Sequence, residues 1–158
     1  MTKVLFVCLG NICRSPTAHG VFQTLVDQHK LSDQFLVDSA GTAAWHIGKS
    51  PDVRSQKAAK KRSYDLNRLQ ARQVASSDFE EFDLILAMDE SNLRHLQGEC
   101  PSEHQYKLAL FLEYSDCEAL AVPDPYYGGV SGFDHVLDLV ESASKGLLNA
   151  LNKDSKKV

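Results

Sequence analysis

The sequence lacks the features that mark membrane and secreted proteins. None of its apolar runs approaches the roughly 20 residues that a membrane-spanning helix needs. The first apolar run, residues 4–8, is too short for a signal peptide and is followed by no small-residue cleavage site. The four cysteines do not predict a disulfide framework, because a core-forming chain inside the cell keeps its thiols reduced. We therefore predict a cytoplasmic protein with no membrane partner.

An excess of positive charge is also missing. The 17 Lys and Arg residues are outnumbered by 21 Asp and Glu residues, and the net charge of −4 argues against nucleic acid as the main partner. An anionic substrate would then require a locally positive site built by a motif. Because the 158 residues contain no linker and no internal repeat, we expect one domain over residues 1–158.

Apolar residues follow two alternating patterns along the chain. Short apolar runs predict strands at residues 3–7, 34–37, 82–88 and 106–111. Helical spacing predicts one helix from residue 15 onward and others over residues 50–62, 91–96 and 133–151. This alternation predicts an α/β fold with a parallel sheet, helices on both faces, and ligands bound beyond the carboxyl ends of the strands. The lysine-rich residues 57–62 are interpreted as a solvated helix face rather than a binding patch.

The most informative segment is CLGNICRSP, residues 8–16, which joins the first predicted strand to the first predicted helix. Backbone N–H groups of such a loop can surround a phosphate, and the positive end of the helix dipole adds to the attraction. Gly10 and Asn11 suit the positive φ angles of a sharp loop. The same field should lower the pKa of Cys8 below the roughly 8.5 of a free thiol and make it a nucleophile. Arg14 can bind two phosphate oxygens side by side.

A phosphate ester of a phenol also needs a proton donor, because a phenolate with a pKa near 10 is a poor leaving group. Asp124 is the best candidate, since Pro123 and Pro125 restrict the backbone on both sides of it. An isolated Asp-Pro pair is an ordinary turn signal. The presence of the Cys8 motif in the same chain favours the catalytic interpretation.

These segments resemble the low-molecular-weight protein tyrosine phosphatases. The resemblance rests on residues 8–16 and 124–127, and extends in family order to residues 38–42, 71–73 and 88–92. It implies a four-stranded parallel sheet, no cofactor, no metal, and a two-step reaction. Cys8 would attack phosphorus while Asp124 protonates the tyrosyl oxygen, and water would then hydrolyse the cysteinyl-phosphate with Asp124 as base. Ser15 would stabilise the departing thiolate.

The resemblance also implies supporting roles around the phosphate-binding loop. Asn11 and Ser39 would hold the loop in shape, and Trp45 and Tyr127 would form the walls of a cleft deep enough to favour a phenyl ring. The expected phosphate-binding residues of the loop are Leu9, Gly10, Asn11, Ile12, Cys13 and Ser15. Cys13 is also a candidate redox partner, because a neighbouring thiol can trap an oxidised Cys8 as a disulfide. The expected partners are a phosphotyrosine protein and inorganic phosphate, the latter as product and inhibitor, and the expected state is a monomer or weak dimer.

Three alternatives stay open at this point. A thiol-dependent arsenate reductase uses a similar Cys-x5-Arg loop, but residues 80–99 contain none of the additional redox cysteines that it would need. A non-catalytic module that binds phosphate or senses redox state would have no use for Asp124. The sequence spacing of Cys8, Cys13, Cys100 and His104 would allow a zinc site, but an anion-binding loop explains the first two cysteines better.

Overall fold

The computed structural model describes residues 1–125 and 130–155. One sheet of four parallel strands forms its centre, in the order β2-β1-β3-β4. The strands are β1 (Thr2–Cys8), β2 (Phe35–Gly41), β3 (Leu84–Ala87) and β4 (Leu108–Leu110). The prediction of a single α/β domain with a four-stranded parallel sheet is confirmed.

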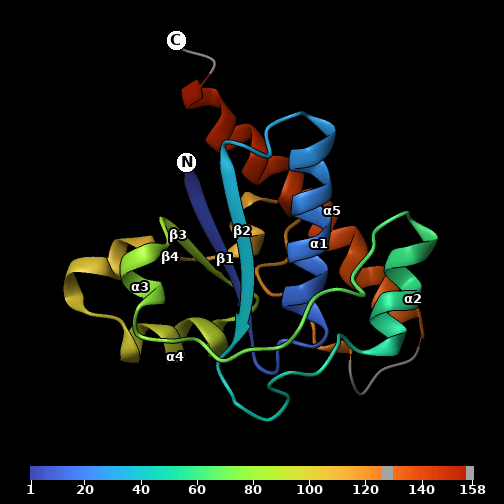
Figure 1. Cartoon of the computed structure of the whole chain (residues 1–158), viewed down its shortest axis with the longest axis horizontal. Helices are drawn as coiled ribbons and strands as arrows, with labels where there is room; N and C mark the ends of the chain where they lie inside the picture. Colours follow the sequence, from blue (N-terminus) through green and yellow to red (C-terminus); the bar gives the residue numbers. More distant parts are fainter. Residues whose placement is uncertain (126–129, 156–158) are drawn as a thin grey trace.

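Helices cover both faces of this sheet (Figure 1). Alternate residues of β1 explain the two layers: Val4 and Phe6 belong to the core beneath α1 (Arg14–Gln28) and α5 (Val130–Ser155), whereas Leu5 and Val7 belong to the core on the other face. That second face is covered by α3 (Asp78–Glu81) and α4 (Glu90–Glu99). Helix α2 (Val53–Lys61) lies beside α5, on the side of the molecule away from α3 and α4.

The second strand is longer than the sequence indicates. The sequence predicts residues 38–41 as part of a polar loop, but they continue β2 and pair with β1 up to Cys8 and Gly41. The loop prediction was wrong because the ladder with β1 supplies the backbone hydrogen bonds of this polar stretch, and because Ser39 and Ala40 are buried.

The bounds of other elements also differ from those predicted from the sequence. The fourth strand shrinks to three residues because the 3₁₀ helices η1 (Ser102–Lys107) and η2 (Phe111–Tyr114) flank it. The short helix α3 has no counterpart among the predicted elements, and α4 extends the predicted 91–96 in both directions. Within the described residues, no helix is both long enough and apolar enough to cross a membrane.

The contact between α5 and η2 gives a test of the packing. A Cβ on Gly146 would lie 1.8 Å from the carbonyl oxygen of Tyr114, so this helix can approach η2 only with glycine there. We expect Gly146→Ala to lower the free energy of unfolding by about 1–3 kcal/mol or more, measured by urea denaturation.

Gly98 provides the matched control for that experiment. It lies in α4, and a Cβ added to it would have nothing within 4 Å, so Gly98→Ala should leave stability unchanged or raise it by about 0.5–1 kcal/mol. Equal urea midpoints for the two variants would contradict the packing argument.

Candidate active site

The loop between β1 and α1 lies at the carboxyl edge of the sheet, where Cys8 ends the strand and Arg14 begins the helix. Its carbonyl groups are bound from outside: Thr42 N–H donates to Cys8 O (2.9 Å), Ala43 N–H to Leu9 O (3.0 Å) and Asp52 N–H to Ile12 O (2.7 Å). In a trans peptide the N–H points opposite to the carbonyl. The N–H groups that follow these three carbonyls are therefore turned inward, as an anion site requires.

The backbone angles of this loop confirm one of two predictions. Asn11 has φ of 57°, in the left-handed region that Asn tolerates. Gly10 does not adopt a positive φ, so the prediction for it was wrong. The role of Gly10 is steric instead: it leaves room for the imidazole of His46, because a Cβ at this position would lie 3.0 Å from Cδ2 of His46.

The Cys8 thiol lies at the bottom of the loop, and the residue is 2% exposed. Its Sγ is 3.0 Å from Oγ of Ser15 and accepts a hydrogen bond from Asn11 N–H at 3.3 Å. Polar donors therefore surround a sulfur atom that the sheet otherwise buries.

The side chain of Asn11 connects the loop to the rest of the fold. Its Nδ2 donates to Ser15 Oγ (2.7 Å), and its Oδ1 accepts from Arg72 N–H (3.0 Å). The Arg72 guanidinium in turn binds Asp38 at 3.1 Å and Asp78 at 2.9 Å. Asn11 thus bridges the loop to the segment that follows α2.

Ser39 contacts the site less directly than the resemblance implies. Its Oγ lies 3.0 Å from Nδ1 of His19, a residue of α1. Burial lowers the pKa of His19 despite the opposing charge of Asp38, so this imidazole is mainly neutral at pH 7. The Ser39 N–H donates to Asp38 at 2.8 Å, and Asp38 binds Arg72, so Ser39 reaches the loop only through intermediate residues, on α1 and at Arg72.

Arg14 is 3% exposed and is bound from three sides. It donates to Asp89 (2.6 Å) and to the carbonyl of Val122 (3.1 Å), and its other terminal nitrogen is 3.7 Å from Asp124. Burial acts to lower the pKa of Arg14, but Cys8, Asp89 and Asp124 outweigh it and raise that pKa above its usual value. The guanidinium is therefore a fixed positive charge beside Cys8.

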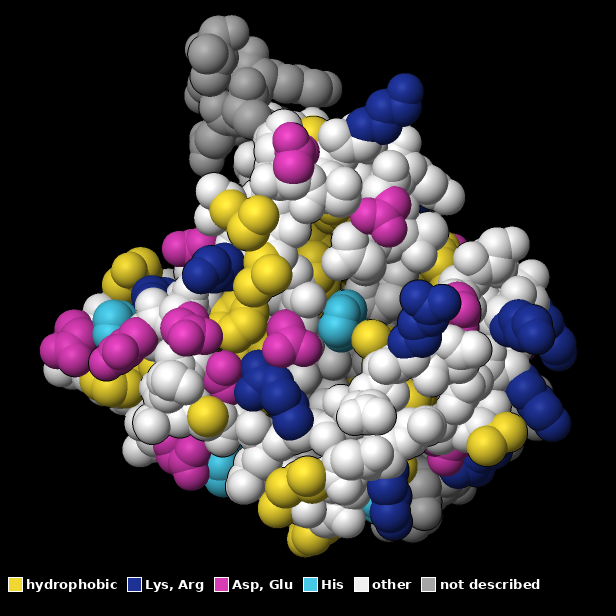
Figure 2. Space-filling view, in the orientation of Figure 1, with side chains coloured by type: hydrophobic (Ala, Val, Ile, Leu, Met, Phe, Trp, Pro, Cys, Tyr) yellow, Lys and Arg dark blue, Asp and Glu magenta, His cyan; other side chains and the backbone are white. Residues whose placement is uncertain are grey.

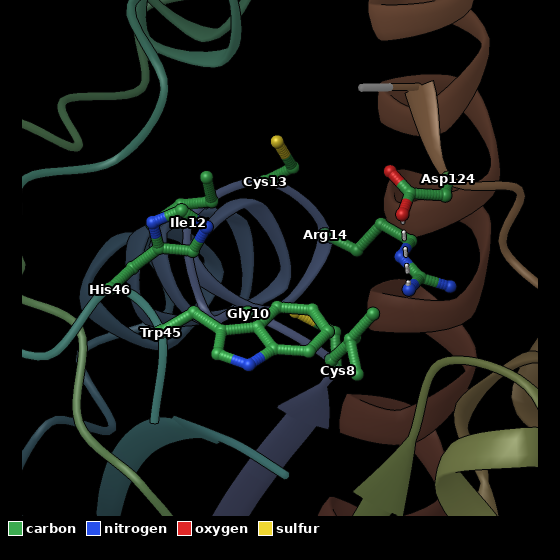
Figure 3. A pocket seen from close by; sticks show the side chains of 9 residues that line it. Cys8, Gly10, Ile12, Cys13, Arg14, Trp45, His46 and Asp124 are labelled. Carbon is green, nitrogen blue, oxygen red and sulfur yellow. Dashed lines mark ion pairs between the residues drawn. The ribbon is translucent and has the colours of Figure 1, made fainter. Parts of the chain in front are cut away.

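A pocket of about 150 Å³ opens above the loop. Figure 3 shows Asp124 on the side of Arg14, and Trp45 and His46 on the side away from it. Trp45 is 69% exposed, and the Asp124 side chain is 37% exposed. The pocket lining includes every predicted catalytic residue and adds His46: Cys8, Leu9, Gly10, Ile12, Cys13, Arg14, Trp45, His46 and Asp124. Tyr127, the other predicted wall, lies outside the described residues.

Cys13 lies in the same loop, but its thiol points away from Cys8 (Figure 3). Burial raises its pKa to about 12; a hydrogen bond with Ser55 opposes the rise, and the charge of Asp52 adds to it. The Cys13 sulfur is therefore protonated at neutral pH and is a weak nucleophile in this conformation.

Three residues of the site were given no role by the sequence interpretation: His46, which lines the pocket, and Asp89 and Arg72, which hold other residues of the site. Asp89 and Arg72 both fall in segments that contribute to the resemblance, yet neither was assigned a role. Asp89 caps α4 through Asn92 N–H (2.7 Å) and binds Arg14 with its other oxygen. The sequence signal for the cap was an Asp just before a helical pattern; nothing in the sequence indicated the ion pair.

The geometry of the described residues does not support a metal site. Among residues 1–125 and 130–155, no three His, Cys, Asp or Glu side chains form a group that could hold a metal ion. The four cysteines are free thiols, and only Cys117 is exposed.

The thiol of Cys13 allows a pH test. With a pKa of about 12, about one molecule in ten thousand carries the thiolate at pH 8, and each pH unit should raise alkylation by iodoacetamide about tenfold. Site-resolved mass spectrometry should find the exposed Cys117 modified well before Cys13 at pH 8. Equal rates for the two thiols at that pH would show that Cys13 is neither buried nor protonated.

Comparisons with known proteins agree on one family. A family model described as low molecular weight phosphotyrosine protein phosphatase matches residues 3–157. A putative low molecular weight protein-tyrosine-phosphatase of Synechocystis is 46% identical over 154 residues, covering 96% of this chain and 98% of the relative. The low molecular weight phosphotyrosine protein phosphatase of Schizosaccharomyces pombe is 48% identical over 147 residues, covering 89% and 94%. A crystal structure of a protein tyrosine phosphatase from Entamoeba histolytica, with Hepes in the active site, superposes with a TM-score of 0.93 at 40% identity and covers 100% of both chains.

Proposed function

The chain belongs to the low molecular weight phosphotyrosine protein phosphatase family and is a protein-tyrosine phosphatase, and on that premise we propose that Cys8 is its nucleophile, Arg14 its phosphate clamp and Asp124 its general acid. The observation that carries this assignment is that the three side chains line one pocket. No other described pocket places a thiol beside a buried guanidinium and a carboxyl group.

In the first step, Cys8 Sγ forms a bond to phosphorus while the bond from phosphorus to the tyrosyl oxygen breaks. Asp124 donates its proton to that oxygen, so tyrosine leaves as the neutral phenol. The inward N–H groups of the loop and the guanidinium of Arg14 bind the phosphoryl oxygens, whose negative charge they stabilise throughout the transfer. A cysteinyl-phosphate remains on the enzyme.

The position of Asp124 fits its proposed role. Its carboxyl group lies 3.7 Å from the guanidinium of Arg14 and lines the pocket above the Cys8 loop. A phosphate bound side by side on that guanidinium would therefore have its ester oxygen near Asp124, within reach of a proton donor.

In the second step, Asp124 is ionised and takes a proton from a water molecule that attacks phosphorus. The phosphorus–sulfur bond breaks, inorganic phosphate is released, and the sulfur leaves as a thiolate. The Ser15 hydroxyl, 3.0 Å from Cys8 Sγ, and the N–H of Asn11 stabilise that negative charge.

The small pocket and its rim suit an aryl phosphate. Leu9, Gly10, Asn11, Ile12, Cys13 and Ser15 would bind the phosphate, with Ser39 as indirect support. Trp45 and Tyr127 would contact the phenyl ring, which reaches the floor where a shorter phosphoserine would not. We further propose a phosphotyrosine protein as substrate, phosphate as product and inhibitor, cytoplasmic location, and a monomer or weak dimer.

Two alternatives are not favoured. An arsenate reductase and a non-catalytic phosphate or redox module both fit the Cys8 loop, but the relatives from Synechocystis and Schizosaccharomyces pombe are named as phosphatases. A regulatory role of Cys13 remains compatible with catalysis. Oxidation of Cys8 to a sulfenic acid by a peroxide, followed by attack of Cys13 with loss of water, would give a disulfide; the protonated Cys13 would first have to turn toward Cys8 and lose its proton.

The mechanism predicts a pattern across variants in steady-state hydrolysis of aryl phosphates with EDTA present. Cys8→Ser should lose at least about a thousandfold in kcat/KM, because its hydroxyl is a far weaker nucleophile. Asp124→Asn should lose at least about tenfold on phenyl phosphate, and less on p-nitrophenyl phosphate, because a more acidic phenol leaves without a proton.

The control is Cys117→Ser, which removes an exposed thiol outside the pocket and should leave turnover within about twofold of the wild type. Activity that survives Cys8→Ser would refute the assignment of the nucleophile. An equal loss on both esters in Asp124→Asn would remove the proton-donor role.

A further inference from the structure

One exposed surface next to the pocket has no role in the mechanism above. Helix α2 turns Ala58 and Ala59 into the core and leaves three lysines exposed: Lys57, Lys60 and Lys61. These three residues are called the α2 lysine face below. The sequence interpretation treated them as an ordinary solvated helix surface. Their position in the fold, on a helix that contacts the active-site loop, indicates a binding surface instead.

The α2 lysine face is the part of this basic segment whose side chains are not held in ion pairs. Arg54 pairs with Asp52 at 3.2 Å, and Arg62 pairs with Asp138 at 2.9 Å and with Glu141. Within the described parts of the chain, Lys57, Lys60 and Lys61 form no ion pair within 4 Å.

Charge is also unevenly distributed over the face of the molecule that Figure 2 shows. The net charge is −4, yet Figure 2 shows Lys and Arg side chains gathered on the side of α2, and Asp and Glu side chains gathered on the opposite side. A local positive field on an acidic protein attracts a short acidic segment more than a long polyanion, which would also meet the acidic side.

Two hollows lie along this face. One of about 420 Å³ is lined by Lys57, Lys60 and Lys61 together with Phe133 and a single carboxylate, Asp134. The other, of about 450 Å³, is lined by Lys57 and Lys60 together with Val53 and a single carboxylate, Asp65. Lysines therefore outnumber carboxylates in both hollows. Lys57 and Lys60 thus stand between two grooves. An extended chain could lie in either groove with its carboxylates beside the ammonium groups.

The active-site loop and α2 are in direct contact. Asp52, the N-cap of α2, donates its N–H to Ile12 O of the loop at 2.7 Å. With a helix rise of 1.5 Å per residue, the three lysines lie about 6–12 Å along the axis from Val53. An extended peptide advances about 3.3 Å per residue, so if the chain leaves the pocket at the start of α2, the residues about two to four positions from the phosphotyrosine would pass the three lysines.

We propose that the α2 lysine face binds acidic residues that flank the phosphotyrosine of a protein substrate. This proposal rests on the phosphatase function proposed above and names its substrate class: phosphotyrosine segments with Asp or Glu about two to four residues away. Because the lysines lie outside the pocket, they add affinity for the flanking chain and leave the chemistry at phosphorus unchanged.

Phosphopeptides of matched length test the proposal. One carries Ala, and the others carry Glu, two to four residues before or after phosphotyrosine. The wild type should show a kcat/KM about three- to tenfold higher for one acidic peptide than for the Ala peptide, as two or three exposed ion pairs allow. That preference should shrink between about 50 and 500 mM salt. In Lys57→Gln/Lys60→Gln it should fall below about twofold.

The control double variant is Lys30→Gln/Lys145→Gln, which removes the same charge from exposed positions outside α2 and should keep the wild-type preference. Both double variants should hydrolyse p-nitrophenyl phosphate at the wild-type rate. No turnover of that ester by the wild type would refute the phosphatase assignment itself, whereas normal turnover without an acidic preference would refute only the docking proposal.

Two further outcomes would overturn the proposal. An equal loss of preference in both double variants would show an effect of net charge instead of a binding surface. If the wild type binds vesicles of anionic lipid, Lys57→Gln/Lys60→Gln abolishes that binding, and the peptide preference is unaffected, then the face binds a membrane surface and not the substrate.

Discussion

The buried guanidinium of Arg14 is the constraint on which the architecture of the site depends. A cation that is 3% exposed loses most of its hydration, and without partners such burial costs several kcal/mol. Asp89, at the start of α4, and the carbonyl of Val122 provide those partners. The fold must therefore bring the end of β3 and the segment before Asp124 to the first residue of α1, and this places Asp124 in the same pocket as Cys8.

The same requirement explains why Asp89 has two contacts. One carboxylate oxygen caps α4 at 2.7 Å, and the other binds Arg14 at 2.6 Å. A capping carboxylate is held by its helix, so it costs little additional conformational entropy to orient the guanidinium. Arg14 is thereby fixed relative to Cys8 before any substrate arrives, which is the preorganisation that electrostatic catalysis needs.

Local sequence patterns led to the three residues that are proposed as catalytic, and their side chains line one pocket. Cys8 and Arg14 share one short motif, and Asp124 was selected by its flanking prolines. The contacts that support these residues had no such local signal. Arg72 contacts Asn11, 61 residues away in the sequence, and Asp89 contacts Arg14, 75 residues away, and no local pattern indicates such pairs.

The extension of β2 was missed for a related reason, because a polar strand beside a buried one resembles a loop until its pairing with β1 is known. Gly10 was interpreted by its freedom in φ, whereas the neighbouring imidazole of His46 explains the absence of a side chain there.

The distribution of charge shows how an acidic protein can act on an anion. Acidic residues bind the arginines of the site region: Asp89 and Asp124 bind Arg14, and Asp38 and Asp78 bind Arg72. These ion pairs fix the positions of the two guanidinium groups, but they also cancel much of the positive field that would attract a phosphate from a distance. The inward N–H groups of the loop then act only at close range, since dipole fields fall off within the first turn. Long-range attraction must come from cations that are not held in ion pairs. Among the described residues, the lysines of α2 are such cations, and they lie on the helix whose N-cap contacts the loop.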